Sequence, residues 1–232
     1  MNTELIATST VKLSISQCDF LSPYISEGDK EPSWDGNVYI HKDSRKKKSG
    51  VKKVTVQVKG KACSDFSKDK ITYPVSVEDM NNYLYNGGAI YFVVYIKKYG
   101  QETKIYYSTL TPIKLNMYLK DAAEQKSKNI PLIEFPSDNN KKATLFLNFY
   151  EDCLKQASFA GKELPTIDEL SSAGILESLT MSVSGYGPNT NDPTPALLNN
   201  EMYMYANIKG STIPQPIELI PDSLHIAKPL NY

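Results

Sequence analysis

The run AIYFVVYI, residues 89–96, limits the possible folds more than any other segment of the chain. It is continuously apolar and too short to cross a membrane, so it predicts a strand that is covered on both faces. A valine-rich strand, VTVQV, precedes it at residues 54–58, and a helical segment at residues 76–85 separates the two. A strand, a helix and a second strand form a crossover, which predicts that the two strands are parallel neighbours or near neighbours in one sheet.

Capping signals and hydrophobic spacing predict the other elements. Ser76 with Asp79 is typical of a helix start, and Asn86-Gly87-Gly88 is typical of a helix end. The residues between Lys61 and Ser76 are expected to form a loop. A first helix is predicted over residues 5–20, with Leu5, Val11, Ile15 and Cys18 on one face. Further strands are predicted over residues 38–41 and 105–110, and a short helical piece from Pro112. A last helix over residues 143–159 is expected to pack on the sheet through Leu147, Tyr150, Leu154 and Ala157.

The predicted fold class is α/β, with a mixed sheet flanked by helices over residues 1–160. After Gly161 proline and asparagine become frequent, and short runs such as LESLTMSVS and EMYMYANI predict a small β-rich region over residues 161–232. About 70 residues make a small core. We therefore expect this accessory region to lean on the first domain or on a partner.

Charge is distributed unevenly although the formal net charge is zero. Residues 42–61 hold nine Lys or Arg and one acid, whereas residues 161–232 hold three lysines and eight acids. A local basic patch can concentrate an anionic ligand, and a run of charge can equally be a solvated hairpin tip.

The N-terminus has no charged segment followed by an apolar run, and no stretch is long and apolar enough for a membrane helix. The three cysteines, Cys18, Cys63 and Cys153, show neither metal-site nor disulfide spacing. We expect a cytoplasmic protein without a membrane partner.

The connection at residues 42–50 predicts a hairpin whose strands fold symmetrically about its centre, which places Asp35 opposite Gln57. Even-numbered positions of the two strands then form an apolar face, and odd-numbered positions form a polar face. Directly opposed Cβ atoms lie about 5 Å apart. Asp35, Gln57 and Lys59 are therefore expected to converge at one end of the sheet.

These residue types suit a site for a hard divalent cation such as Mg²⁺, which prefers oxygen ligands. Asp35 offers a carboxylate, Gln57 an amide oxygen and Val58 its backbone carbonyl. Lys59 can orient the attacking water or neutralise charge at a scissile phosphate. Taken alone, such a trio is also typical of a polar solvent face. The neighbouring basic residues expected to bind a phosphate backbone are Arg45, Lys46, Lys47, Lys48, Lys52, Lys53 and Lys61.

WDG, then VQVKG, Tyr73-Pro74-Val75, a helix and the apolar strand follow one another in an order that resembles the restriction-endonuclease-like superfamily, the PD-(D/E)xK nucleases. The chain is most similar to the branch in bacterial anti-phage defence proteins that reads D…QxK. The resemblance covers about residues 4–110, with weaker support to residue 160. It implies a restriction-endonuclease-like sheet, with Asp35 and Gln57 as metal ligands and Lys59 as the catalytic lysine. It also implies an acid on the first helix, for which Glu4 is the candidate.

The expected function is that of a Mg²⁺- or Mn²⁺-dependent DNA endonuclease. The resemblance implies an effector of anti-phage defence, controlled by a regulatory or sensor protein or domain, or by homo-oligomerisation. Gln57 removes one negative charge from the site, which leaves open a non-catalytic scaffold that binds nucleic acid or protein. A third reading makes the β-rich tail the working part of a protein-interaction module. Convergence of Asp35, Gln57 and Lys59 in space is the observation that separates the nuclease from these alternatives.

Overall fold

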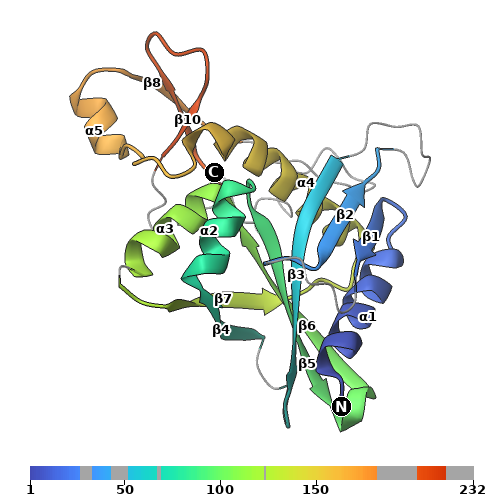
Figure 1. The fold of residues 1–232 in the computed structure, drawn as a ribbon. Coiled ribbons are helices and arrows are strands. Elements are labelled where there is room, and N and C mark those ends of the chain that lie inside the picture. Colours follow the sequence, from blue (N-terminus) through green and yellow to red (C-terminus); the bar gives the residue numbers. More distant parts are fainter. Residues whose placement is uncertain (27–32, 43–51, 67–68, 123, 182–202, 218–232) are drawn as a thin grey trace, which may run out of the picture.

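The computed structural model describes residues 1–26, 33–42, 52–66, 69–122, 124–181 and 203–217. They form a seven-stranded mixed sheet flanked by helices and a small three-stranded antiparallel sheet near the C-terminus (Figure 1), so the predicted α/β class is confirmed. The strands of the two sheets lie in the orders β1-β2-β3-β5-β6-β7-β4 and β10-β9-β8. The elements are α1 (Thr3–Ser16), β1 (Leu21–Ile25), β2 (Gly36–Ile40), β3 (Lys52–Ala62), β4 (Lys70–Ser76), α2 (Val77–Tyr85), β5 (Ala89–Lys97), η1 (Lys98–Gly100), β6 (Glu102–Leu110), α3 (Pro112–Ala122), β7 (Ser127–Glu134), α4 (Asn139–Gln156), η2 (Ala157–Phe159), α5 (Ile167–Ser172), β8 (Leu176–Thr180), β9 (Tyr205–Ile208) and β10 (Gln215–Pro216).

The predicted crossover is present at the centre of the large sheet. Strand β5 lies parallel to β3, with Val56 beside Ile90 and Gln57 beside Tyr91. Ser76 caps α2 by accepting a hydrogen bond from the Asp79 backbone N–H, as its sequence predicts. Strand β5 is buried at every position from Ala89 to Val94, which agrees with a strand that is covered on both faces.

Each face of the large sheet carries its own hydrophobic core. Helices α1 and α4 cover the face formed by the even-numbered positions of β2, β3 and β5. The opposite face of β5 is covered by α2, α3 and the pair β4–β7, which runs across the direction of β3 and β5 in Figure 1. The first core contains Val11, Ile15, Val54, Val56, Ile90, Phe92 and Phe146, and the second contains Ile71, Met80, Tyr83, Tyr91, Val93, Leu115 and Ile130.

Three strands of the large sheet were not expected from the sequence, and each contains a proline. Pro23 lies in β1 and Pro74 in β4, which are the two edge strands. Pro131 lies in β7, which pairs with β6 only at residues 106 and 107. Proline cannot donate to a ladder hydrogen bond and is tolerated at sheet edges. The loop expected between Lys61 and Ser76 therefore needs correction, because it contains β4.

The helices also differ in detail from the expected pattern. Helix α1 ends at Ser16 rather than near Phe20, and Leu5 is 41% exposed instead of belonging to the buried face. Helix α4 starts at Asn139 and turns Phe146 and Phe149 toward the sheet, whereas Leu154 is 57% exposed. The predicted helical piece at Pro112 is present and extends to Ala122, and α5 was not predicted.

The small sheet contacts α4 and the chain before α3 through buried hydroxyl groups. Tyr205 donates its phenolic hydrogen to Asp152 Oδ1 at 3.0 Å and accepts one from Gln156 Nε2 at 3.3 Å. Thr111 Oγ1 donates to the Tyr203 hydroxyl at 2.9 Å. These contacts agree with the expectation that the β-rich region leans on the preceding domain. In the described ranges no helix has the length and apolar character that a membrane crossing needs.

Candidate functional site

The β2–β3 hairpin has the register that the sequence predicts. Gly36 pairs with Val56, and the strands continue in step to Ile40 and Lys52. The Gln57 side-chain amide, Nε2, donates a hydrogen bond to Asp35 Oδ2 at 2.6 Å. The predicted opposition of Asp35 and Gln57 is therefore confirmed. The hairpin tip, including Arg45, Lys46, Lys47 and Lys48, lies outside the described residues.

The backbone around Asp35 is held on both sides. Its N–H donates to the Val56 carbonyl at 3.0 Å, and its own carbonyl accepts from Ser26 N at 2.8 Å. The next residue, Gly36, has φ +149°, and a Cβ there would lie 2.1 Å from the Tyr24 carbonyl oxygen. Only glycine fits such a position. In the W-D-G sequence, the candidate ligand Asp35 is therefore followed by a glycine that lets β1 lie close to β2.

The Asp35 carboxylate, one residue before β2 begins, continues the hydrogen bonding along β3 beyond the last pair of the two strands. Oδ2 accepts from the Val58 backbone N–H at 2.7 Å in addition to the Gln57 amide. Gln57 Nε2 also donates to the Val58 carbonyl at 3.4 Å, and the Gln57 residue is only 3% exposed. The amide N–H groups therefore lie between a carboxylate oxygen and a carbonyl oxygen.

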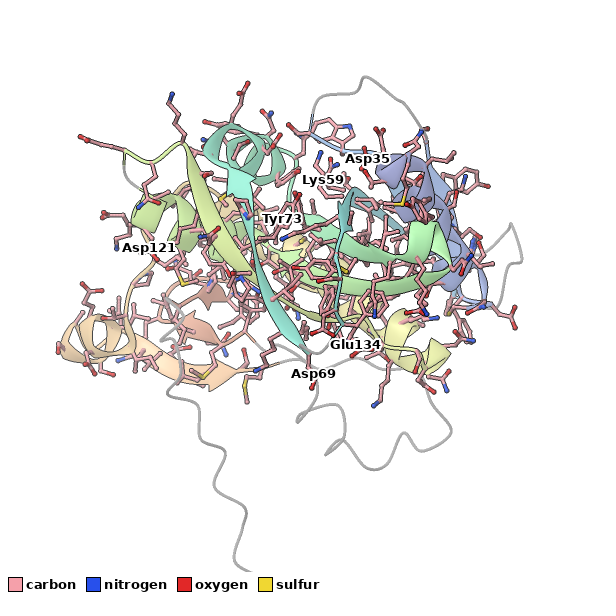
Figure 2. The ribbon with its side chains drawn as sticks, turned by 90° about the horizontal axis from the view of Figure 1, so that it is seen from below. Asp35, Lys59, Asp69, Tyr73, Asp121 and Glu134 are labelled. Atoms are coloured by element: carbon pink, nitrogen blue, oxygen red, sulfur yellow. The ribbon has the colours of Figure 1, made fainter. Side chains whose placement is uncertain are left out.

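Lys59 follows two positions later on the same face of β3 and is exposed. Figure 2 shows Asp35, Lys59 and Tyr73 in one region of the molecule seen from below, with Asp69, Asp121 and Glu134 at other places in the view. Because alternate residues of a strand point to the same face, Gln57 and Lys59 lie on one face of β3, which agrees with the positions seen in the figure. The three predicted residues therefore share one face and one end of the sheet.

A group of tyrosines borders this place, which the sequence analysis did not anticipate. Tyr91 lies beside Gln57 in the parallel ladder, with the rings of Tyr73 and Tyr83 centred 6.1 and 6.4 Å from its own. Burial raises the pKa of the Tyr83 and Tyr91 phenols well above the usual value, and the carboxylates of Asp79 and Asp35 add to the shift. The two phenols stay protonated at physiological pH, so they can donate hydrogen bonds and cannot act as bases.

A second group, on α2, holds the segment that carries Asp35. The Ser33 hydroxyl donates to Asp79 Oδ1 at 2.7 Å and accepts from Asn82 Nδ2 at 2.7 Å. Ser33 has φ +74°, which is strained for a residue with a side chain. Asp79 was predicted only as part of a helix cap. Its position in the first turn of the crossover helix brings it against the segment that carries Asp35.

The Ser33 contacts give a first prediction. Ser33→Ala should destabilise the protein by about 1–3 kcal/mol, because Asp79 and Asn82 lose a partnered hydroxyl while the backbone strain remains. Ser33→Gly loses the same hydrogen bonds and relieves the strain, so it should be about 1 kcal/mol more stable than Ser33→Ala. Urea unfolding of the three proteins measures both differences. Equal stability of the alanine and glycine variants would contradict the assigned strain.

The residues present are compatible with a divalent cation, although their charge is low. Within the described ranges no group of three His, Cys, Asp or Glu side chains is placed to hold a metal. The candidate set instead combines the Asp35 carboxylate with two neutral oxygens. Rotation of the Gln57 amide would bring its oxygen to the place of Nε2, near the Asp35 carboxylate and the Val58 carbonyl. One carboxylate with neutral oxygens, water and substrate phosphate is an arrangement that Mg²⁺ accepts.

Two other predicted site residues lie away from this group. Glu4 is in the first turn of α1, which packs on the opposite, even-numbered face of β3. Lys52 also belongs to that face, where it forms an ion pair with Glu151 and lies 5.1 Å from the centre of the Tyr150 ring. The ion pair of Lys52 therefore turns this side chain away from Gln57 and Lys59, and α1 lies on the face of β3 opposite to them.

Lys53 and Lys61 share the odd-numbered face with Lys59, on opposite sides of it along β3. Both are exposed, and Lys61 Nζ lies 5.3 Å from the centre of the Tyr95 ring. These two predicted basic residues therefore lie on the same face of β3 as Gln57 and Lys59.

Comparison of the chain with models of protein families, with curated proteins and with solved structures found no match.

Proposed function

We propose that the chain is a metal-dependent DNA endonuclease of the PD-(D/E)xK type that hydrolyses phosphodiester bonds. The observation that carries the proposal is the direct contact between Asp35 and Gln57, with Lys59 exposed on the same face two residues later. These residues come from two strands, and their order and spacing match the D…QxK pattern. The exposed lysines at positions 53 and 61 extend positive charge along the same face.

The chain's own residues have separate tasks in this proposal. Asp35, the rotated amide of Gln57 and the Val58 carbonyl hold Mg²⁺ or Mn²⁺, which supplies Lewis-acid stabilisation and an acidified water. The Lys59 ammonium group reaches the substrate from solvent and neutralises charge that develops on the scissile phosphate. The backbone hydrogen bonds of Asp35 and the Ser33 contacts with α2 keep the carboxylate in position, which reduces the reorganisation needed on binding.

The biological setting that we propose follows from the resemblance. The nuclease acts as an effector in bacterial anti-phage defence, in the cytoplasm, and a regulatory protein, a sensor domain or self-association controls it. The small sheet near the C-terminus, whose Leu179 and Met181 are 41% and 45% exposed, is a candidate place for such control.

A second candidate function is a non-catalytic scaffold of the same fold. The Asp35 carboxylate already accepts two hydrogen bonds from the chain, from Gln57 Nε2 and from Val58 N. A carboxylate with two such hydrogen bonds can have a purely structural role, in which it binds the backbone of β3 beyond the start of β2. This candidate predicts that nucleic acid or protein binds without any requirement for a metal.

Cleavage of plasmid DNA with Mg²⁺ or Mn²⁺ tests the nuclease. Asp35→Asn and Lys59→Ala should each lower the rate by about 10²–10³-fold, because the first weakens the hold on the cation and the second removes the positive charge that neutralises the scissile phosphate. Lys98→Ala is the matched control, since it removes an exposed lysine at the turn between β5 and β6. Excess EDTA should stop the wild type.

Calorimetry with Mn²⁺ separates the two candidates independently of activity. The nuclease predicts binding heat for the wild type and for Lys59→Ala, and its loss in Asp35→Asn. No heat from any of the proteins would favour the scaffold. Cleavage that both site variants retain would exclude Asp35 and Lys59 as the site.

A further inference from the structure

No helix of the described residues covers the face of β1, β2 and β3 that lies next to the candidate site. On this face β1 and β2 place Tyr24 opposite Asn37, and β2 and β3 place Asn37 opposite Thr55. The next row holds Tyr39 opposite Lys53. We call these five residues, Tyr24, Asn37, Tyr39, Lys53 and Thr55, the tyrosine face.

Within the described part of the chain, Tyr24 and Lys53 of the tyrosine face are exposed, whereas Asn37, Tyr39 and Thr55 are half-buried. Helices α1 and α4 pack on the even-numbered positions of β2 and β3, and α2 packs over β5. Tyr24 is 65% exposed, although its ring meets that of Tyr39 edge to face with centres 5.1 Å apart. An aromatic pair across two strands stabilises a sheet. That role does not need Tyr24 to present most of its surface to water.

The charge of this region complements a polyanion. Strands β1, β2 and β3 contain four lysines and no aspartate or glutamate. Lys52 is turned away to Glu151, whereas Lys53, Lys59 and Lys61 belong to the odd-numbered face. Among the described residues of these strands and their ends, the carboxylate at this face is that of Asp35, whose Oδ2 already accepts hydrogen bonds from Gln57 and Val58.

The tyrosine face is continuous with the candidate site along the strands. Tyr39 follows Asp35 by four residues, which corresponds to about 13 Å of extended chain. Tyr24 and Asn37 lie between, in the row next to the pair Asp35–Gln57. A chain of nucleotides that crosses the face would therefore lead directly to the site.

We propose that the tyrosine face binds an unpaired DNA strand, whose bases stack on Tyr24 and Tyr39 while Lys53 contacts its phosphates. Exposed aromatic rings combined with cations are the usual means of binding single strands, since every unpaired base offers a face for stacking. A duplex keeps its base faces stacked on each other and cannot use the two rings in this way. The inference rests on the proposed nuclease function for its biological meaning, and it names the form of DNA that reaches the site.

The test measures binding of fluorescent oligonucleotides of about 15 nucleotides by anisotropy in EDTA, where no cleavage occurs. The probes are oligo-dT, oligo-U and a DNA duplex of mixed sequence. Wild type should bind oligo-dT at least about tenfold more tightly than the duplex. Tyr24→Ala and Tyr39→Ala should each weaken binding of oligo-dT about tenfold, whereas Tyr24→Phe should retain it. Lys53→Gln should lower the slope of log affinity against log salt by about one unit.

Several outcomes would overturn the proposal. They are equal affinity for duplex and oligo-dT, binding that the tyrosine variants do not change, no binding of oligo-dT, or tyrosine-dependent binding of oligo-U alone. Thermal unfolding of each variant checks folding, and Tyr24→Phe preserves the ring contact with Tyr39. The two proposals can fail separately. Tyrosine-dependent binding of oligo-dT by a protein that does not cleave DNA would support the tyrosine face and contradict the nuclease. Cleavage of DNA by a protein whose binding of oligo-dT does not depend on the tyrosines would support the nuclease and contradict the tyrosine face.

Discussion

The Gln57→Glu variant is expected to lose about 3 kcal/mol or more of folding stability in EDTA at pH 8, and to recover most of it in Mg²⁺ or Mn²⁺. Gln57 is 3% exposed and donates its hydrogen bond to Asp35 Oδ2 at 2.6 Å. A glutamate at this position would bring a second carboxylate against the first in a buried place. A bound cation between the two would remove the repulsion, and the added charge would tighten its binding.

The pH dependence of this variant has a definite sign. Two adjacent carboxylates, one of them at the buried position 57, share a proton, so the folded pKa of the pair lies above the unfolded value. The folded state then binds more protons than the unfolded state, and stability falls as pH rises through that folded pKa. In EDTA the variant should therefore be closer to wild type at pH 5 than at pH 8.

Gln57→Met is the matched control for the charge. It removes the amide without adding a carboxylate, so its loss of stability should be smaller and should not depend on the metal. Differential scanning fluorimetry of the three proteins, with and without metal at both pH values, gives all the comparisons. A glutamate variant that Mg²⁺ and Mn²⁺ fail to stabilise would contradict a cation site at Asp35 and would favour the scaffold.

The Gly36→Ala variant is expected to lose about 4 kcal/mol or more of folding stability, a large share of the roughly 5–15 kcal/mol that is typical of a domain. Gly36 has φ +149°, and an added Cβ would lie 2.1 Å from the Tyr24 carbonyl oxygen and 2.8 Å from the Ile25 Cα. Both contacts are with the backbone of β1, so no side-chain rotation can relieve them. Relief requires β1 to separate from β2. This separation would occur next to Asp35, the residue before Gly36.

Gly161→Ala is the matched control for backbone strain. Gly161 has φ +72°, and nothing lies within 4 Å of a Cβ built there. Its replacement should cost only the strain of a left-handed residue, about 1–2 kcal/mol. Equal effects of the two substitutions, measured by urea unfolding, would show that the close approach of β1 is not what requires glycine at position 36.

The paired strands around Asp35 illustrate what could be predicted without a structure. The hairpin connection and the alternation of valines with polar residues predicted the register, and Gly36 does pair with Val56. Such pairing depends on a short connection and on residues that are near in sequence. The parallel neighbours β3 and β5 were predictable for a similar reason, because one short helix joins them and crossovers follow few topologies.

The surroundings of the site depend on partners that are distant in sequence. Ser33 and Asp79 are 46 residues apart, and nothing in the sequence around either one indicates the other. Strand β4 follows β3 in the chain but pairs with β7, which begins some fifty residues later. Each of these two strands contains a proline, which weakens the sequence signal for a strand. This pair brings Tyr73 over Tyr91 and so forms the tyrosine border.

The sequence by itself determined which residues face one another across the hairpin, and hence that Asp35, Gln57 and Lys59 share one side of a strand pair. It could do so because the two-residue period of a strand is a local property. Only the tertiary structure decided which face each helix covers, which turns Lys52 away to α4 and leaves Tyr24 and Lys53 of the tyrosine face exposed. That choice results from the burial of all apolar surfaces at once, which the pattern of one segment does not specify.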